Sequence, residues 1–145
     1  MSEVSLMPSI RISASGLNAE NRRMEVLANN VANAQTTRDA YGNVYRRQEV
    51  VFAAGLANAV NAAVAGDKQL SGVQIDQIVQ DDRPLNRDYR PGHPDADTEG
   101  FVMMPNVNIL EEMVDMMSAS RAFEANLAAI RTAKTMAQQA IEILK

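Results

Sequence analysis

The last part of the chain, residues 108–145, contains neither Pro nor Gly, and this uninterrupted stretch constrains the fold most strongly. Apolar residues recur in it at two heptad positions, which is typical of a long helix packed along another helix. The first position holds Ile109, Met116, Phe123, Ile130, Ala137 and Leu144, and the second holds Met113, Ser120, Leu127, Lys134 and Ile141. Asn108 is a suitable N-cap, with Glu111 at the capping-box spacing.

This predicted helix is too long for a compact domain of the same size. At ~1.5 Å per residue it would measure roughly 55 Å. A compact domain of this chain length is only about 30 Å across. We therefore expect the helix to extend beyond its own domain.

A second amphipathic helix is predicted near the amino terminus, over residues 8–33. Its apolar face is built on Ile10, Leu17, Met24 and Val31, which recur every seven residues, and is widened by Ala14, Leu27, Ala28 and Ala34. Pro8 fits the first turn, where a missing N–H is tolerated. Gly16 lies inside the helix at a cost of up to ~1 kcal/mol relative to Ala, which close approach of another helix would explain. Asn33 is the expected C-cap, because Asn tolerates a left-handed conformation.

The region between these helices is predicted to be rich in β-structure. Residues 45–52, 72–80 and 100–104 have the composition of strands, and residues 81–100 have the Pro, Gly and Asp content of a long loop. Residues 53–72 are rich in Ala and could form a short helix or an irregular excursion. The predicted fold is mainly α with a small β-rich insert, its long terminal helices packed as a coiled-coil-like pair. We divide the chain into residues 1–36, 37–105 and 106–145.

Composition excludes several classes of function. The net charge is −4, which argues against a general nucleic-acid binder. We interpret the basic pairs Arg22–Arg23 and Arg46–Arg47 as solvated. The absence of cysteine removes disulfides, thiol catalysis and cysteine zinc sites. No apolar run reaches the ~20 residues of a membrane span, and the first ten residues lack the features of a cleavable signal peptide.

His93 is the single histidine and is followed by three acids, Asp95, Asp97 and Glu99. Catalytic zinc usually needs two or three histidines, and the acids do not fit the spacing of an EF-hand calcium loop. No nucleophile or phosphate-binding motif accompanies them. We therefore interpret this stretch as a hydrogen-bonded loop rather than a metal or catalytic site, and an enzyme hypothesis would rest on His93 alone.

The faces of the two helices away from their apolar stripes are rich in small residues and Asn, which suits packing among copies of the chain. These residues include Ala28, Asn29, Ala32, Asn33, Ser118, Ala122, Ala125, Asn126 and Ala129. A solitary coiled-coil hairpin would instead present charged outer faces. A cytosolic coiled-coil adaptor is the alternative from another class, since it would also explain the heptads.

Two stretches resemble the signatures of bacterial flagellar axial proteins, the family of rod and hook subunits. SGLNAENRRMEVLANNVANAQTT (15–37) resembles their amino-terminal signature, and SASRAFEANLAAIRTAKTM (118–136) resembles their carboxyl-terminal one. Two further stretches narrow the resemblance to the proximal-rod members of this family. They are YGNVYRRQEVVF (41–52) and YRPGHPDADTEGFVMMPNVNILEEMVDMMSASR (89–121). Phe123 stands where many relatives have Tyr. The motif residues are Ser15, Gly16, Leu17, Asn29, Asn30, Asn33, Ser118, Ser120, Arg121 and Asn126.

The resemblance implies a structural subunit of the proximal rod in the basal body. Such a subunit would self-assemble through its terminal helices into a tubular drive shaft that transmits torque across the periplasm. Export would follow the flagellar type III pathway. The implied partners are further copies, the export apparatus and rod proteins of the FlgB, FlgF, FliE and distal-rod FlgG families. No enzymatic activity, catalytic residue, cofactor, metal, nucleic acid or small-molecule ligand is expected.

The apolar stripes supply the residues predicted to pack in that assembly. They are Ile10, Leu17, Met24, Leu27, Val31, Ile109, Met113, Met116, Phe123, Leu127, Ile130, Ile141 and Leu144.

Overall fold

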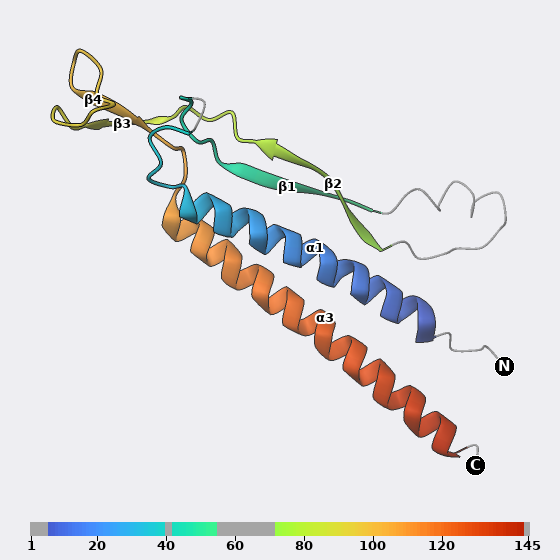
Figure 1. Cartoon of the computed structure of the whole chain (residues 1–145). Coiled ribbons are helices and arrows are strands. Elements are labelled where there is room, and N and C mark those ends of the chain that lie inside the picture. Colours follow the sequence, from blue (N-terminus) through green and yellow to red (C-terminus); the bar gives the residue numbers. More distant parts are fainter. Residues whose placement is uncertain (1–5, 40–41, 55–71, 144–145) are drawn as a thin grey trace, which may run out of the picture. The chain divides into compact units, whose positions relative to one another are not determined.

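The computed structural model describes residues 6–39, 42–54 and 72–143. In the described residues, one long helix comes before four strands in the sequence and a second long helix follows them (Figure 1). The elements are α1 (Leu6–Ala32), β1 (Gln48–Ala54), β2 (Val73–Gln80), β3 (Asn86–Tyr89), β4 (Phe101–Met104) and α3 (Ile109–Ile143). The strands form two two-stranded sheets, β1 with β2 and β3 with β4. The predicted fold class, mainly α with a small β-rich insert, is confirmed.

Contacts divide the chain into two compact units, each assembled from separate stretches of sequence. Unit 1 comprises Met1–Arg22, Val51–Gln77 and Ser118–Lys145, and unit 2 comprises Arg23–Val50 and Ile78–Met117. Each helix thus contributes one part to each unit. The division into residues 1–36, 37–105 and 106–145 stays a prediction.

In unit 1, α1 and α3 approach closely at Gly16. A Cβ atom added to Gly16 would lie 3.1 Å from Nδ2 of Asn126, whose amide donates a hydrogen bond to the Ala122 carbonyl at 3.0 Å. Ala19 and Ala119, which are also small residues, are buried in the same unit. The sequence-based expectation that a second helix approaches Gly16 is confirmed. Asn126, predicted for an outer face, instead lies against α1.

The Gly16 contact predicts a context-dependent effect of adding one methyl group. Gly16→Ala alone should change the free energy of unfolding little, because the ~1 kcal/mol gained in helix propensity is offset by crowding against Asn126. In an Asn126→Ala background, the same substitution should stabilise the chain by about 0.5–1 kcal/mol. Urea unfolding of the natural chain, the two single variants and the double variant measures both values. An equal gain in both backgrounds would contradict the proposed crowding.

The start of α3 and the end of α1 lie at the predicted positions, but the end of α1 does not have the predicted backbone geometry. Asn108 caps α3, since its Oδ1 accepts the Leu110 N–H at 3.1 Å. α1 ends one residue before Asn33, where Nδ2 of Asn33 donates to the Asn29 carbonyl. Among the described residues only glycines have positive φ, so the left-handed end expected of Asn33 is not formed. Successive turns replace it, with the Thr36 N–H donating to the Asn33 carbonyl at 3.0 Å.

The strand predictions need one correction. Residues 81–100 were predicted as loop, yet β3 lies within them and pairs antiparallel with β4, Asn86 opposite Met104 and Tyr89 opposite Phe101. Pairing with an apolar partner strand overrides the low strand propensity of an Asn-Arg-Asp-Tyr sequence. Tyr89 and Phe101 also form an edge-to-face ring contact at 5.3 Å. Of the ambiguous segment 53–72, Ala53 and Ala54 belong to β1, and residues 55–71 lie outside the described residues.

Candidate assembly interface

A buried polar network organises unit 2 around Glu112, near the start of α3. The Glu112 and Asn30 side chains are fully buried. One carboxylate oxygen of Glu112 accepts from Nε of Arg47 at 2.5 Å, and the other accepts from Nδ2 of Asn30 at 2.8 Å. Arg47 also lies within 3.8 Å of the carboxylates of Asp81 and Asp115, with only 12% of its side chain exposed. The network therefore ties the end of α1 to the start of α3.

Two asparagines extend this network to the backbone near β1. Asn30 donates to the Gln48 carbonyl at 2.8 Å, and its Oδ1 accepts the Gln48 N–H at 2.9 Å and the Tyr45 hydroxyl at 2.8 Å. Asn106 accepts the Arg47 N–H at 2.9 Å and donates to the Asp81 carbonyl at 3.2 Å. Both side chains thus satisfy main-chain groups of Arg47, Gln48 and Asp81, where β1 begins and β2 has just ended.

The surroundings of Arg47, Tyr45 and Asp81 shift their pKa values in the directions that keep Arg47 and Asp81 charged and Tyr45 neutral. Burial disfavours the Arg47 cation, but its hydrogen bond and attraction to Glu112 raise its pKa above the ordinary value. Burial and the Glu112 charge raise the pKa of Tyr45, so its hydroxyl keeps the proton that it donates to Asn30. Hydrogen bonds from Arg83 lower the pKa of Asp81.

The lowered pKa of Asp81 predicts an acid dependence of stability. A carboxyl group with a lower pKa in the folded chain stabilises the fold above its unfolded pKa of about 4, and this stabilisation is lost as the pH falls through the folded pKa. Asp81→Asn should reduce stability at neutral pH and weaken its fall below about pH 4. Thermal unfolding across that pH range measures both. Parallel pH profiles for the variant and the natural sequence would contradict the assignment.

Most of the residues in this network were not among those predicted from the sequence. Arg47 was interpreted as solvated, which is wrong because it pairs with buried Glu112. The signal was available in the spacing, since Glu112 lies four residues before half-buried Met116 and seven before buried Ala119, on the same helix face.

The apolar residues predicted to pack fall into two groups. Leu27 is buried, and the half-buried members are Ile10, Leu17, Met24, Val31, Met116, Phe123, Leu127 and Ile130. Ile109, Met113 and Ile141 are exposed. Leu144 lies outside the described residues. The first group fits packing within the chain, and the exposed group leaves room for another molecule. Their role in assembly stays a prediction.

The predicted motif residues have different local roles. Ser15 donates to the Ile12 carbonyl at 2.7 Å and accepts the Val73 N–H at 3.1 Å, which joins α1 to β2. The Asn29 carbonyl accepts from the main chain of Asn33 at the end of α1. Leu17 and Ser120 are half-buried. Ser118 and Arg121 are exposed on α3.

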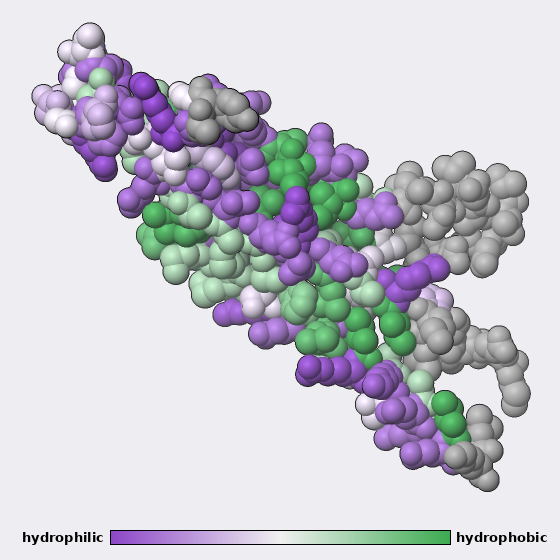
Figure 2. All heavy atoms as spheres, viewed as in Figure 1, coloured by the Kyte–Doolittle hydropathy of each residue, from purple (hydrophilic) through white to green (hydrophobic). Residues whose placement is uncertain are grey.

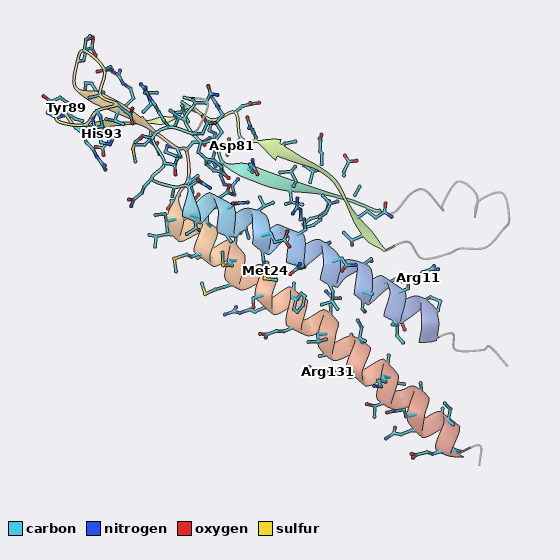
Figure 3. All side chains as sticks on the ribbon, in the orientation of Figure 1. Arg11, Met24, Asp81, Tyr89, His93 and Arg131 are labelled. Atoms are coloured by element: carbon cyan, nitrogen blue, oxygen red, sulfur yellow. The ribbon has the colours of Figure 1, made fainter. Side chains whose placement is uncertain are left out.

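Figure 3 labels His93, which lies in the loop between β3 and β4. The acids that follow it bind groups of this hairpin and of residues 37–38. Asp95 accepts from the Thr37 hydroxyl at 2.7 Å and pairs with Arg38 at 3.0 Å. Asp97 accepts the N–H groups of Glu99 and Phe101, each at 2.9 Å, and the Phe101 bond lowers its pKa. Within the described ranges, no group of three His, Cys, Asp or Glu side chains is placed to hold a metal ion. These acids therefore structure the loop.

Comparison with known proteins matches the two helices separately. The family model "Flagella basal body rod protein" matches residues 10–38, and "Flagellar basal body rod FlgEFG protein C-terminal" matches residues 98–143. The chain is 41% identical to the flagellar basal-body rod protein FlgC of Borreliella burgdorferi, over 97% of this chain and 98% of that protein. It is 39% identical to FlgC of Bacillus subtilis, over 94% and 97% of the two chains. FlgC of Escherichia coli O6:H1 is 38% identical, over 92% and 93%.

Paired terminal helices carrying both matched signatures define a structural subunit of the flagellar rod. Identity over nearly the whole length then specifies the branch: the chain belongs to the FlgC family of flagellar basal-body rod proteins. It is located in the basal-body rod, and membership of a structural family confirms that it is not an enzyme. None of the helices in the described part of the chain combines the length and apolar character needed to cross a membrane.

Proposed function

We propose that this rod subunit belongs to the proximal rod and self-assembles through α1 and α3 into a tubular shaft that transmits torque across the periplasm. The observation that supports this most directly is the number of apolar side chains that α3 leaves exposed. They include Ile109, Leu110, Met113, Val114, Met117, Met136, Ile141 and Ile143. Burying one such side chain contributes ~1.5–3 kcal/mol, so assembly has a large driving force available.

The proposed mechanism depends on stiffness. Long helices packed along one another resist bending, because bending would disrupt close-packed side chains over many turns. In this proposal residues 1–36 and 106–145 supply the packed core of the shaft, and residues 37–105 lie outside it. The subunit would contact further copies and rod proteins of the FlgB, FlgF, FliE and FlgG families. It would reach the rod through the flagellar type III export apparatus.

The experiment is a cryo-EM map of basal bodies from cells that express this chain as their only FlgC-family protein. We expect density for paired helices of the length of α1 and α3 in the proximal rod, and no rod beyond the membrane-embedded base when the gene is deleted. Complete rods in the deletion strain would overturn the proposal.

A further inference from the structure

The His93 side chain accepts a hydrogen bond that a short polar side chain usually accepts in a turn. Residues 93–96 form a tight turn, in which the Ala96 N–H donates to the His93 carbonyl at 3.0 Å. Within this turn, the Asp95 N–H donates to Nδ1 of His93 at 3.1 Å. Asn and Asp side chains commonly accept such a bond from the N–H two residues ahead. In this chain the acceptor is an imidazole, which can take up a proton.

The donor of this bond determines the protonation state of the ring. A main-chain N–H can only donate, so Nδ1 must present its lone pair and the neutral ring must carry its proton on Nε2. A second proton would occupy the lone pair and remove the acceptor. The bond between the Asp95 N–H and Nδ1 therefore exists only while His93 is uncharged.

A positive charge on the ring would be attracted to the carboxylate of Asp95. Oδ2 of Asp95 lies 3.8 Å from Nδ1, and the same oxygen accepts the Thr37 hydroxyl at 2.7 Å. Oδ1 of Asp95 pairs with Arg38 at 3.0 Å. A protonated Nδ1 would become a donor and would compete with Thr37 for Oδ2. Since this carboxylate joins the hairpin loop to residues 37–38, protonation of His93 acts on that link.

The other charged side chains around the loop have partners of their own, and charges that are already paired attract the ring less than Asp95 does. In the segment that holds Thr37, Asp39 accepts the Asn43 N–H at 2.9 Å. The charged side chains of the hairpin form ion pairs with one another, namely Arg90 with Asp88, and Arg87 with Asp97 and Glu99.

The ring is open to solvent and is the group that responds to mild acid. The His93 side chain is 29% exposed, and Figure 2 shows mainly hydrophilic and near-neutral colours over the hairpin, at the upper left. Histidine is the side chain that ordinarily changes charge between pH 5 and 8, whereas carboxyl groups ordinarily do so near pH 4. His93 is the single histidine of the chain.

We propose that His93 is a pH-sensitive switch that controls how the loop of the β3–β4 hairpin is tied to residues 37–38. In its neutral form the ring accepts the Asp95 N–H, and the Asp95 carboxylate holds Thr37 and Arg38. When the ring takes up a proton, the N–H bond is lost and the carboxylate turns toward the imidazolium, which weakens the link to Thr37. The switch involves no second molecule and is independent of the proposed assembly.

NMR of the purified full-length chain across pH 5–8 tests the switch. Hydrogen exchange of the Asp95 amide is divided by the rate of an unstructured peptide at each pH, which gives its protection. We expect this protection to fall about fivefold as the ring resonances of His93 titrate, the factor that corresponds to one ordinary hydrogen bond. The methyl resonance of Thr37 should shift with the same midpoint. The amides of Glu99 and Phe101, which donate to Asp97 in the same loop, should keep constant protection.

The matched variant is His93→Asn, because Asn supplies an acceptor that does not titrate. It should keep the protection of the Asp95 amide constant, with no shift of Thr37, across the same pH range. An equal fall in protection in this variant would overturn the proposal, since the loss would not come from the ring.

Two results from the natural chain alone would also overturn the switch, so the test does not depend on the folding of the variant. The first is constant protection of the Asp95 amide while the His93 ring titrates. The second is a Thr37 resonance that does not move during that titration, because the ring would then not act on residues 37–38.

Discussion

Glu112→Ala should lower the free energy of unfolding by about 3–5 kcal/mol, the range for removing one partner from a buried ion pair. The substitution leaves the Arg47 guanidinium, only 12% exposed, without its closest carboxylate, and leaves Nδ2 of Asn30 with one acceptor fewer. It also opens a cavity where a fully buried side chain stood. Urea unfolding followed by circular dichroism gives the change directly.

The neighbouring acid supplies the matched control for this substitution. Glu111 follows the same N-cap but is exposed, so Glu111→Ala should change stability by less than about 0.5 kcal/mol. Replacing both Glu112 and Arg47 by Met should give a chain more stable than Glu112→Ala, because no buried charge is left unpaired. Strictly additive effects of Glu112→Met and Arg47→Met in that double variant would show that the ion pair does not couple the two residues.

The sequence was sufficient to predict the two helices, because their information is local and repeated. The heptads, the Asn108 cap and the absence of Pro and Gly all point to the same helix, and α3 spans Ile109–Ile143. The start and end of α1 were predicted within two residues. Gly16 was a local conflict with helix propensity, and the close approach of Asn126 explains it.

Long-range pairings could not be predicted in the same way. β3 has little strand character of its own and exists because β4 lies opposite it. The hydrogen-bond partners of Glu112 are Asn30 and Arg47, which are 82 and 65 residues away in the sequence. Helix periodicity identifies the face on which Glu112 lies, but not which residues it contacts.

The His93 loop shows why residue type alone is a weak guide to function. A histidine and three acids suggested chemistry, yet Asp95 binds Thr37 and Arg38, and Asp97 binds main-chain N–H groups of its own loop. Short polar side chains commonly stabilise turns in this way. The chemistry of the loop is therefore that of a scaffold, which agrees with a structural family.

Leu127→Asp or Ile130→Asp is expected to abolish motility by preventing rod assembly. Both side chains lie on the half-buried face of α3. An aspartate there would be buried without a cation, at a cost of several kcal/mol, which exceeds the contribution of any one apolar contact. Swimming in soft agar and electron microscopy of purified basal bodies measure the result, and we expect no rod beyond the membrane-embedded base.

Gln139→Asp on the exposed side of the same helix is the matched control, because it adds the same charge where water solvates it. It should leave swimming and rods normal. Circular dichroism of the purified variants then separates two causes: loss of helix in the free chain indicates failed folding, and retained helix indicates failed assembly. Normal rods with Leu127→Asp or Ile130→Asp would show that this face of α3 is not required in the assembled rod, and would contradict assembly through the terminal helices.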